Sequence, residues 1–151
     1  MNKSEDYIIY TDGACLGNPG PGGWAAIIFD KKLGIKKEKI GSELQTTNNR
    51  MELIAVIGAL SVIPNDSSIL IFTDSKYVID GIKSWILRWK SNNWIGSNKK
   101  EIKNKDLWVS LDRLVGKFKI QWTWVKGHSG NKHNEEVDRL AKLEASKLNI
   151  I

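Results

Sequence analysis

The chain has 151 residues, which suits one domain with a single core. Its formal net charge is +6, and about 28% of its residues are Leu, Ile, Val or Phe, which excludes a disordered chain. The single cysteine, Cys15, excludes an internal disulfide, and with only two histidines it also excludes the usual Cys/His zinc clusters. The polar start and the lack of any ~20-residue apolar run predict neither a signal peptide nor a membrane span, and favour the cytosol.

The positive charge is concentrated in one window, residues 83–105. This window holds seven Lys or Arg residues and one acid, Glu101, so its net charge equals that of the whole chain. A local basic patch is the electrostatic footprint of a polyanion partner, and nucleic acid is the commonest such partner. The alternative at this point is an ordinary solvated face.

The first third of the chain predicts three strands joined by turns. Residues 7–14 and 23–30 are rich in β-branched and aromatic residues, and residues 33–44 alternate in polarity. The Gly- and Pro-rich segment 15–22 separates the first two strands. We therefore expect an antiparallel three-stranded meander.

The rest of the chain alternates helices with strands. Apolar residues recur at three- and four-residue spacing from Met51 to Val62, which predicts a helix ending at Pro64. Thr47, Asn48 and Asn49 are N-cap candidates at its start, where Asn49 and Glu52 fit a capping box. Further elements are predicted as a strand at 68–73, one or two short helices at 77–89, a helix at 104–115, a strand at 119–125 and a helix at 132–148. This order predicts an α/β fold in which parallel strands extend the meander into a mixed sheet with helices on both faces.

Four acids stand at positions where chemistry is possible. Asp12 interrupts a predicted strand, where Asp is disfavoured, and Asp74 follows the most apolar strand, at the end where open α/β sheets bind ligands. Glu52 lies in the first turn of its helix and Asp138 lies near the start of the last one. Each has an ordinary alternative: Asp74 can cap the next helix, Glu52 can complete the capping box and Asp138 can be a surface acid. If the strands carrying Asp12 and Asp74 are neighbours, all four carboxylates can meet.

Converging carboxylates repel one another, and a divalent cation relieves that repulsion. A site made of oxygen ligands suits Mg²⁺ or Mn²⁺. Beside a patch that attracts polyanions, the natural chemistry is phosphodiester hydrolysis assisted by two metal ions. His128, in the loop KGHSGN before Asp138, is a candidate for proton transfer, whereas His133 is expected to be a solvated residue at the start of the helix.

Five segments carry a family resemblance that covers nearly the whole chain. They are YTDGACLGNPGPGGW at 10–24, TTNNRMEL at 46–53, IFTDSKYV at 71–78, the WKSNNW…KNKDLW stretch at 89–108 and GHSGNKHNEEVDRLA at 127–141. In order and spacing they closely resemble type 1 ribonuclease H of the bacterial kind. The resemblance implies a ribonuclease H-like α/β fold with a five-stranded mixed sheet, in one domain over residues 1–151 without a separate hybrid-binding domain.

This resemblance implies an activity and a set of catalytic residues. The activity is hydrolysis of the RNA strand of RNA/DNA hybrids to 5′-phosphate and 3′-hydroxyl ends, by a monomer that uses Mg²⁺ or Mn²⁺, with two ions in the presence of substrate. The family's catalytic and metal-binding acids fall on Asp12, Glu52, Asp74 and Asp138, and its loop histidine falls on His128.

The resemblance also implies contacts with the substrate. Recognition of the RNA 2′-hydroxyl in the shallow minor groove falls on Asn48 and Asn49, and Trp85 with the basic loop is expected to contact the DNA strand. The full set of substrate-binding residues is Cys15, Asn18, Thr47, Asn48, Asn49, Trp85, Lys99, Lys100, Asn104 and Asn134. Thr47 and Asn104 match a phosphate pocket, which we expect to hold its phosphate more weakly because Gln45 stands where relatives often have Arg.

Two other functions stay open on the sequence. A junction-resolving or integrase-type nuclease of the same fold shares the clustered acids, but lacks the segments 46–53 and 89–108 together. A non-catalytic hybrid-binding protein would be favoured by the loss of any of the four acids, and none is lost.

Overall fold

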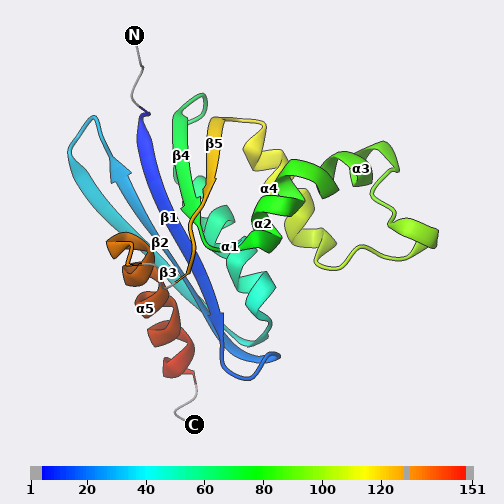
Figure 1. Ribbon diagram of the computed structural model, residues 1–151, viewed down its shortest axis with the longest axis horizontal. Helices are drawn as coiled ribbons and strands as arrows, with labels where there is room; N and C mark the ends of the chain where they lie inside the picture. The colour runs from blue at the N-terminus through cyan, green and yellow to red at the C-terminus, as the bar shows by residue number, and fades with distance from the viewer. Residues whose placement is uncertain (1–4, 128–129, 149–151) are drawn as a thin grey trace.

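The computed structural model describes residues 5–127 and 130–148 (Figure 1). Its strands form one mixed sheet in the order β3-β2-β1-β4-β5. The strands are β1 (Tyr7–Cys15), β2 (Gly20–Asp30), β3 (Ile35–Thr46), β4 (Ser68–Thr73) and β5 (Lys119–Trp124). β1, β2 and β3 pair antiparallel, whereas β4 pairs parallel with both β1 and β5. The predicted meander extended by parallel strands is therefore confirmed.

Helices cover both faces of the sheet, as predicted (Figure 1). α5 (Lys132–Lys147) packs on one face, and α1 (Asn48–Leu60) and α4 (Lys105–Val115) lie on the other. Between β4 and α4 the chain forms a helical arm that consists of α2 (Lys76–Asp80), the π-helical η1 (Gly81–Trp85), α3 (Ile86–Ser91) and the 3₁₀ turn η2 (Ser97–Lys99). Among the helices described, none is long and apolar enough to cross a membrane.

Alternation along β2 divides the apolar residues between two cores. Ala26 and Ile28 belong to the core on the α1 side, whereas Ala25 and Ile27 pack with α5. Successive side chains of a strand point to opposite faces, so a continuous apolar run supplies both cores. This is why the strand reads as uninterrupted apolar sequence rather than as an alternating one.

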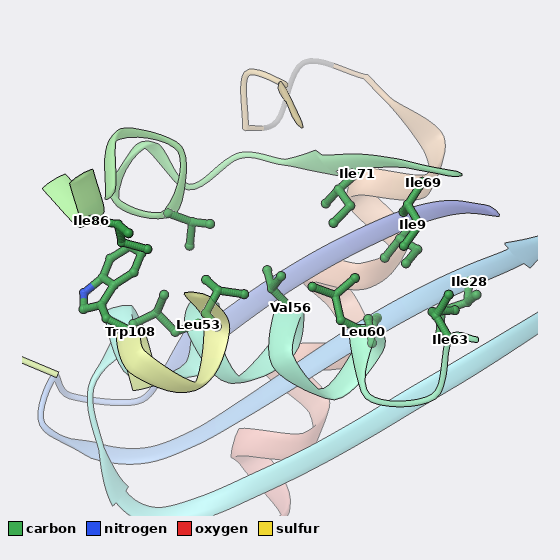
Figure 2. Packing of buried hydrophobic residues seen from close by; sticks show 14 of the residues in the cluster. Ile9, Ile28, Leu53, Val56, Leu60, Ile63, Ile69, Ile71, Ile86 and Trp108 are labelled. Atoms are coloured by element: carbon green, nitrogen blue, oxygen red, sulfur yellow. The ribbon is translucent and has the colours of Figure 1, made fainter. Parts of the chain in front are cut away.

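The larger core lies between α1 and the central strands. Figure 2 shows Leu53, Val56 and Leu60 of α1 directed toward Ile9 of β1 and Ile71 of β4. All five side chains are almost completely buried. Burying a side chain of this size contributes roughly 1.5–3 kcal/mol, so this core fixes α1 against the two strands that carry Asp12 and Asp74.

The arm is attached to α4 through Trp108, which is fully buried. Gly81 begins η1, and a Cβ at this position would overlap the Trp108 ring. Glycine therefore allows the arm to approach α4 closely. The rings of Trp85 and Trp89 complete the contact, each within 6.2 Å of the Trp108 ring centre.

Candidate active site

Three carboxylates converge at the end of the sheet where β4 finishes. Asp12 in β1, Glu52 in α1 and Asp74 after β4 each place one oxygen within 4.8 Å of the others. Asp12 and Glu52 are buried, with exposed fractions of 3% and 4%, and Asp74 is half-buried. The meeting of these three acids, expected from the sequence, is therefore seen in the fold.

The register of two parallel strands places Asp12 beside Asp74. Thr11 of β1 and Thr73 of β4 form the last pair between these strands, so Asp12 and Asp74 follow that pair at the same level of the sheet. Ser75 caps α2, because its side chain accepts a hydrogen bond from a backbone N–H in the first turn. The alternative in which Asp74 caps this helix is therefore wrong, and its carboxylate joins the other two acids instead.

Glu52 reaches the cluster because Gly13 lets α1 approach β1. A Cβ at Gly13 would overlap the backbone nitrogen of Glu52. The N–H of Gly13 donates to Oδ1 of Asp12 at 2.9 Å and also to Oε1 of Glu52. Of the N-cap candidates, Thr47 is confirmed. The capping-box interpretation is wrong, since Asn49 lies inside the helix and Glu52 lies beyond its first turn.

Asp138 reaches the same place from α5. It lines a hollow of about 380 Å³ together with Asp12, Glu52 and Asp74, although it is outside the group of three oxygens that lie within 4.8 Å of one another. Asp138 also forms an ion pair of 3.0 Å with Lys142, one turn further along the helix. The structure thus brings all four predicted acids to one hollow and ties the fourth to a lysine.

The electrostatics of the cluster favour a cation. Burial raises the pKa of Asp12 strongly, and the charges of Glu52 and Asp74 raise it further. Burial likewise raises the pKa of Glu52, despite the hydrogen bonds that lower it. Oδ2 of Asp12 is buried and has no hydrogen-bond partner among the described residues. A divalent cation would favour the charged carboxylates and satisfy this oxygen, so the residues fit a metal site with oxygen ligands.

Several predicted substrate contacts lie near the acids. Asn48 and Asn49 line the hollow. The backbone N–H of Asn48 donates to Oδ1 of Asn18 at 2.9 Å, which joins the Gly- and Pro-rich turn to the start of α1. The thiol of Cys15 points to two backbone carbonyl oxygens, at 3.4 and 3.5 Å. This end of α1 and the neighbouring turn therefore form one connected rim.

Lys76 and Tyr77 also line the hollow, and neither was predicted from the sequence. The ammonium group of Lys76 lies 4.9 Å from the ring centre of Trp124, whose indole N–H donates to the carbonyl oxygen of Asp74 at 3.0 Å. Both residues follow Asp74 at the start of α2. Their closeness to Asp74 along the chain was the one feature of the sequence that pointed to them.

The residues predicted to contact the DNA strand lie on the arm, which extends away from the sheet (Figure 1). Trp85 is half-buried, and its ring packs against those of Tyr77 and Trp89. Lys99 and Lys100 are exposed on the loop that follows α3. The arm therefore presents cations beside a half-buried aromatic cluster.

The start of α5 differs in part from expectation. His133 is not simply solvated, because its ring centre lies 4.9 Å from those of Tyr10 and Phe29, which project from the face of the sheet that α5 covers. Asn134 is buried, with 2% of its surface exposed. His128 lies outside the residues that the structure describes.

Comparisons with known proteins find relatives along nearly the whole chain. Residues 4–146 match the family model described as RNase H. Ribonuclease H of Francisella philomiragia subsp. philomiragia is 51% identical to this chain, and that of Francisella tularensis subsp. novicida is 52% identical; each match covers 98% of this chain and 96% of the relative.

Solved structures show the same fold. LC9-RNase H1, described as a type 1 RNase H with the type 2 active-site motif, has a TM-score of 0.86 at 30% identity, covering 98% of this chain and 75% of that one. LC11-RNase H1, in complex with an RNA/DNA hybrid, has a TM-score of 0.67 at 22% identity, covering 93% of this chain and 97% of that one.

Proposed function

Because the chain belongs to the ribonuclease H family, we propose that it hydrolyses the RNA strand of RNA/DNA hybrids and leaves 5′-phosphate and 3′-hydroxyl ends. The observation that carries this proposal is the convergence of Asp12, Glu52 and Asp74 within 4.8 Å at one hollow. The complex of LC11-RNase H1 with an RNA/DNA hybrid supports this class of substrate. We further propose that the enzyme acts as a monomer in the cytosol, within one domain over residues 1–151.

The metal ligands in this proposal are Asp12, Glu52, Asp74 and Asp138. They hold Mg²⁺ or Mn²⁺, with two ions when substrate is bound, since all four supply oxygen. Such ions activate a water molecule and stabilise the leaving oxygen of a phosphodiester. Burial fixes Asp12 and Glu52 in place, whereas Asp74 and Asp138 are the more exposed pair.

Recognition of RNA is assigned to the rim beside α1. Asn48 and Asn49 line the hollow and present side-chain amides that can meet a 2′-hydroxyl, the group that distinguishes RNA from DNA. Asn18 holds the backbone of Asn48, and Cys15 lies in the adjoining end of β1. This rim is therefore placed to follow the RNA strand next to the acids.

The remaining residues are assigned to the DNA strand, to phosphate binding and to proton transfer. Trp85, Lys99 and Lys100 on the arm are assigned to the DNA strand, since aromatic and cationic groups suit a sugar-phosphate backbone. Thr47 and Asn104 are assigned to a phosphate, with Gln45 weakening that pocket, and Asn134 is assigned to the neighbourhood of the scissile phosphate. The imidazole of His128 is assigned to proton transfer.

Incubation of labelled duplexes with and without Mg²⁺ tests this function. The substrates are an RNA/DNA hybrid, double-stranded RNA and double-stranded DNA, and the ends of the products are analysed. Cleavage of the RNA strand of the hybrid alone, dependent on the metal, is expected. Cleavage of double-stranded DNA would favour a different nuclease of this fold, and binding of the hybrid without cleavage would favour a non-catalytic binder.

A further inference from the structure

We propose that Arg50 is a positioning residue that fixes the side-chain amide of Asn104, so that one of its N–H groups faces a substrate phosphate. This inference rests on the proposed function, in which Asn104 binds the substrate backbone. Arg50 itself is not required to touch the substrate. Its role is to determine which end of the amide the phosphate meets.

Arg50 joins α1 to the start of α4. Its Nη1 and Nη2 atoms donate to the two carboxylate oxygens of Asp106, at 3.1 and 3.0 Å. Nη1 also donates to Oδ1 of Asn104 at 3.3 Å. A guanidinium group can only donate, so this contact requires the oxygen of the amide to face Arg50. The carboxylate of Asp106 holds the guanidinium in the geometry that makes the contact.

The nitrogen of the same amide is fixed from the other side. Nδ2 of Asn104 donates to the hydroxyl oxygen of Tyr77 at 3.1 Å, and the indole N–H of Trp108 donates to this oxygen at 3.0 Å. Nδ2 carries two protons, and contacts within the described residues use one. The other N–H is the kind of donor that a phosphate oxygen accepts, whereas a flipped amide would present an oxygen and repel it.

The side chain of Asn104 makes these contacts in place of a helix-capping hydrogen bond. Asn104 is the N-cap residue of α4, in the left-handed conformation with φ 59° and ψ 28°, yet its side chain makes no capping hydrogen bond. Asn at this position usually caps the first turn of its helix. Here the side chain instead bridges Arg50 and Tyr77. Tyr77 lines the hollow of the acids, so the bridge connects the phosphate contact to the catalytic end of the sheet.

A double-mutant cycle tests this role. Arg50→Met keeps an unbranched, flexible side chain but removes the charge and the donors, and it is made in the wild type and in Asn104→Ala. We expect Arg50→Met to raise KM for the hybrid by about 10-fold with little change in kcat, since hydrogen bonds to charged groups have about this effect. In the Asn104→Ala background the same change is expected to have no further effect. Arg50→Lys, which keeps a donor and the charge, is expected to restore most of the affinity.

The matched control is Lys36→Met, which removes another long-range ion pair, between Lys36 and Glu136 at 2.6 Å. Neither residue lines the hollow of the acids. Its KM should equal that of the wild type. An equal rise in KM for Arg50→Met in both backgrounds would overturn the positioning role. Unchanged KM in Asn104→Ala would also overturn it, and would place the error in the assignment of Asn104 to the substrate. Melting temperatures of all variants separate loss of fold from loss of affinity.

Discussion

Replacing Asp12 with Asn is expected to abolish cleavage and, at the same time, to stabilise the metal-free protein. Asp12 is 3% exposed, and its carboxylate shares a space with those of Glu52 and Asp74. Without a cation, folding must bring these groups together against their repulsion and away from water. Asn has the same shape and cannot ionise, so it removes one acid from the cluster.

The size of the effect follows from this geometry. Two ionised carboxylates 4.8 Å apart repel each other by about 3.5 kcal/mol at an effective dielectric constant of 20. The true effect is smaller, because the raised pKa values of Asp12 and Glu52 show that the cluster keeps protons. The amide of Asn also gains a donor that faces the remaining carboxylates. We expect the free energy of unfolding to rise by about 1–3 kcal/mol.

Urea unfolding at pH 8 in EDTA measures this change. The matched control is Asp30→Asn, on the same sheet, because Asp30 is also buried but lies outside the acid cluster and accepts a hydrogen bond from Leu33 at 3.1 Å. The control should not be stabilised, because the amide oxygen of Asn still accepts this hydrogen bond and the change relieves no repulsion in the cluster. With Mg²⁺ present, the wild type should gain stability by ligand binding and Asp12→Asn should gain much less. Destabilisation of Asp12→Asn in EDTA, or a stability change no greater than that of the control, would show that repulsion in the cluster does not oppose folding.

Three further predictions concern pH, the arm and the loop. Folding raises the pKa of the buried acids Asp12 and Glu52, so the folded state binds more protons than the unfolded state. The metal-free protein should therefore lose stability as pH rises from about 4. Urea unfolding across pH measures this, and a free energy of unfolding that increases with pH would contradict it. Replacing Lys99, Lys100 and Lys103 with Ala should raise KM and reduce the salt slope by about one unit per lost phosphate contact, whereas an unaltered slope would place the loop away from the duplex. His128→Ala should lower kcat by ~10²–10⁴, and an unchanged rate would exclude proton transfer by this residue.

The positions of Asp12 and Asp74 could be predicted, because Asp12 departs from the residue preference of a strand and Asp74 follows from the order of the strands. Asp12 attracts attention because an acid is disfavoured inside a strand. Asp74 follows a strand that is apolar enough to be central. Once β1 and β4 are neighbours and parallel, the two acids must emerge together. The sequence therefore contained enough information for this half of the cluster.

The rest depends on contacts between distant segments. Glu52 fits a local capping box, and only the approach of Gly13, 39 residues away, shows that its carboxylate turns to β1 instead. His133 looks like a solvated residue until Tyr10 and Phe29 place their rings beside it. The link between Arg50 and Asp106 spans 56 residues. No local pattern specifies such pairs, because they are selected by how helices pack on the sheet.

Cleavage and binding of the hybrid by Asp74→Asn test most directly whether the converging acids hold catalytic metal ions. We expect hybrid binding close to that of the wild type but cleavage at least ~10³-fold slower, since loss of a metal ligand removes several kcal/mol of transition-state stabilisation. Asp80→Asn, the same change at an exposed position in α2, should leave both unchanged. Near-normal cleavage by Asp74→Asn would contradict the account.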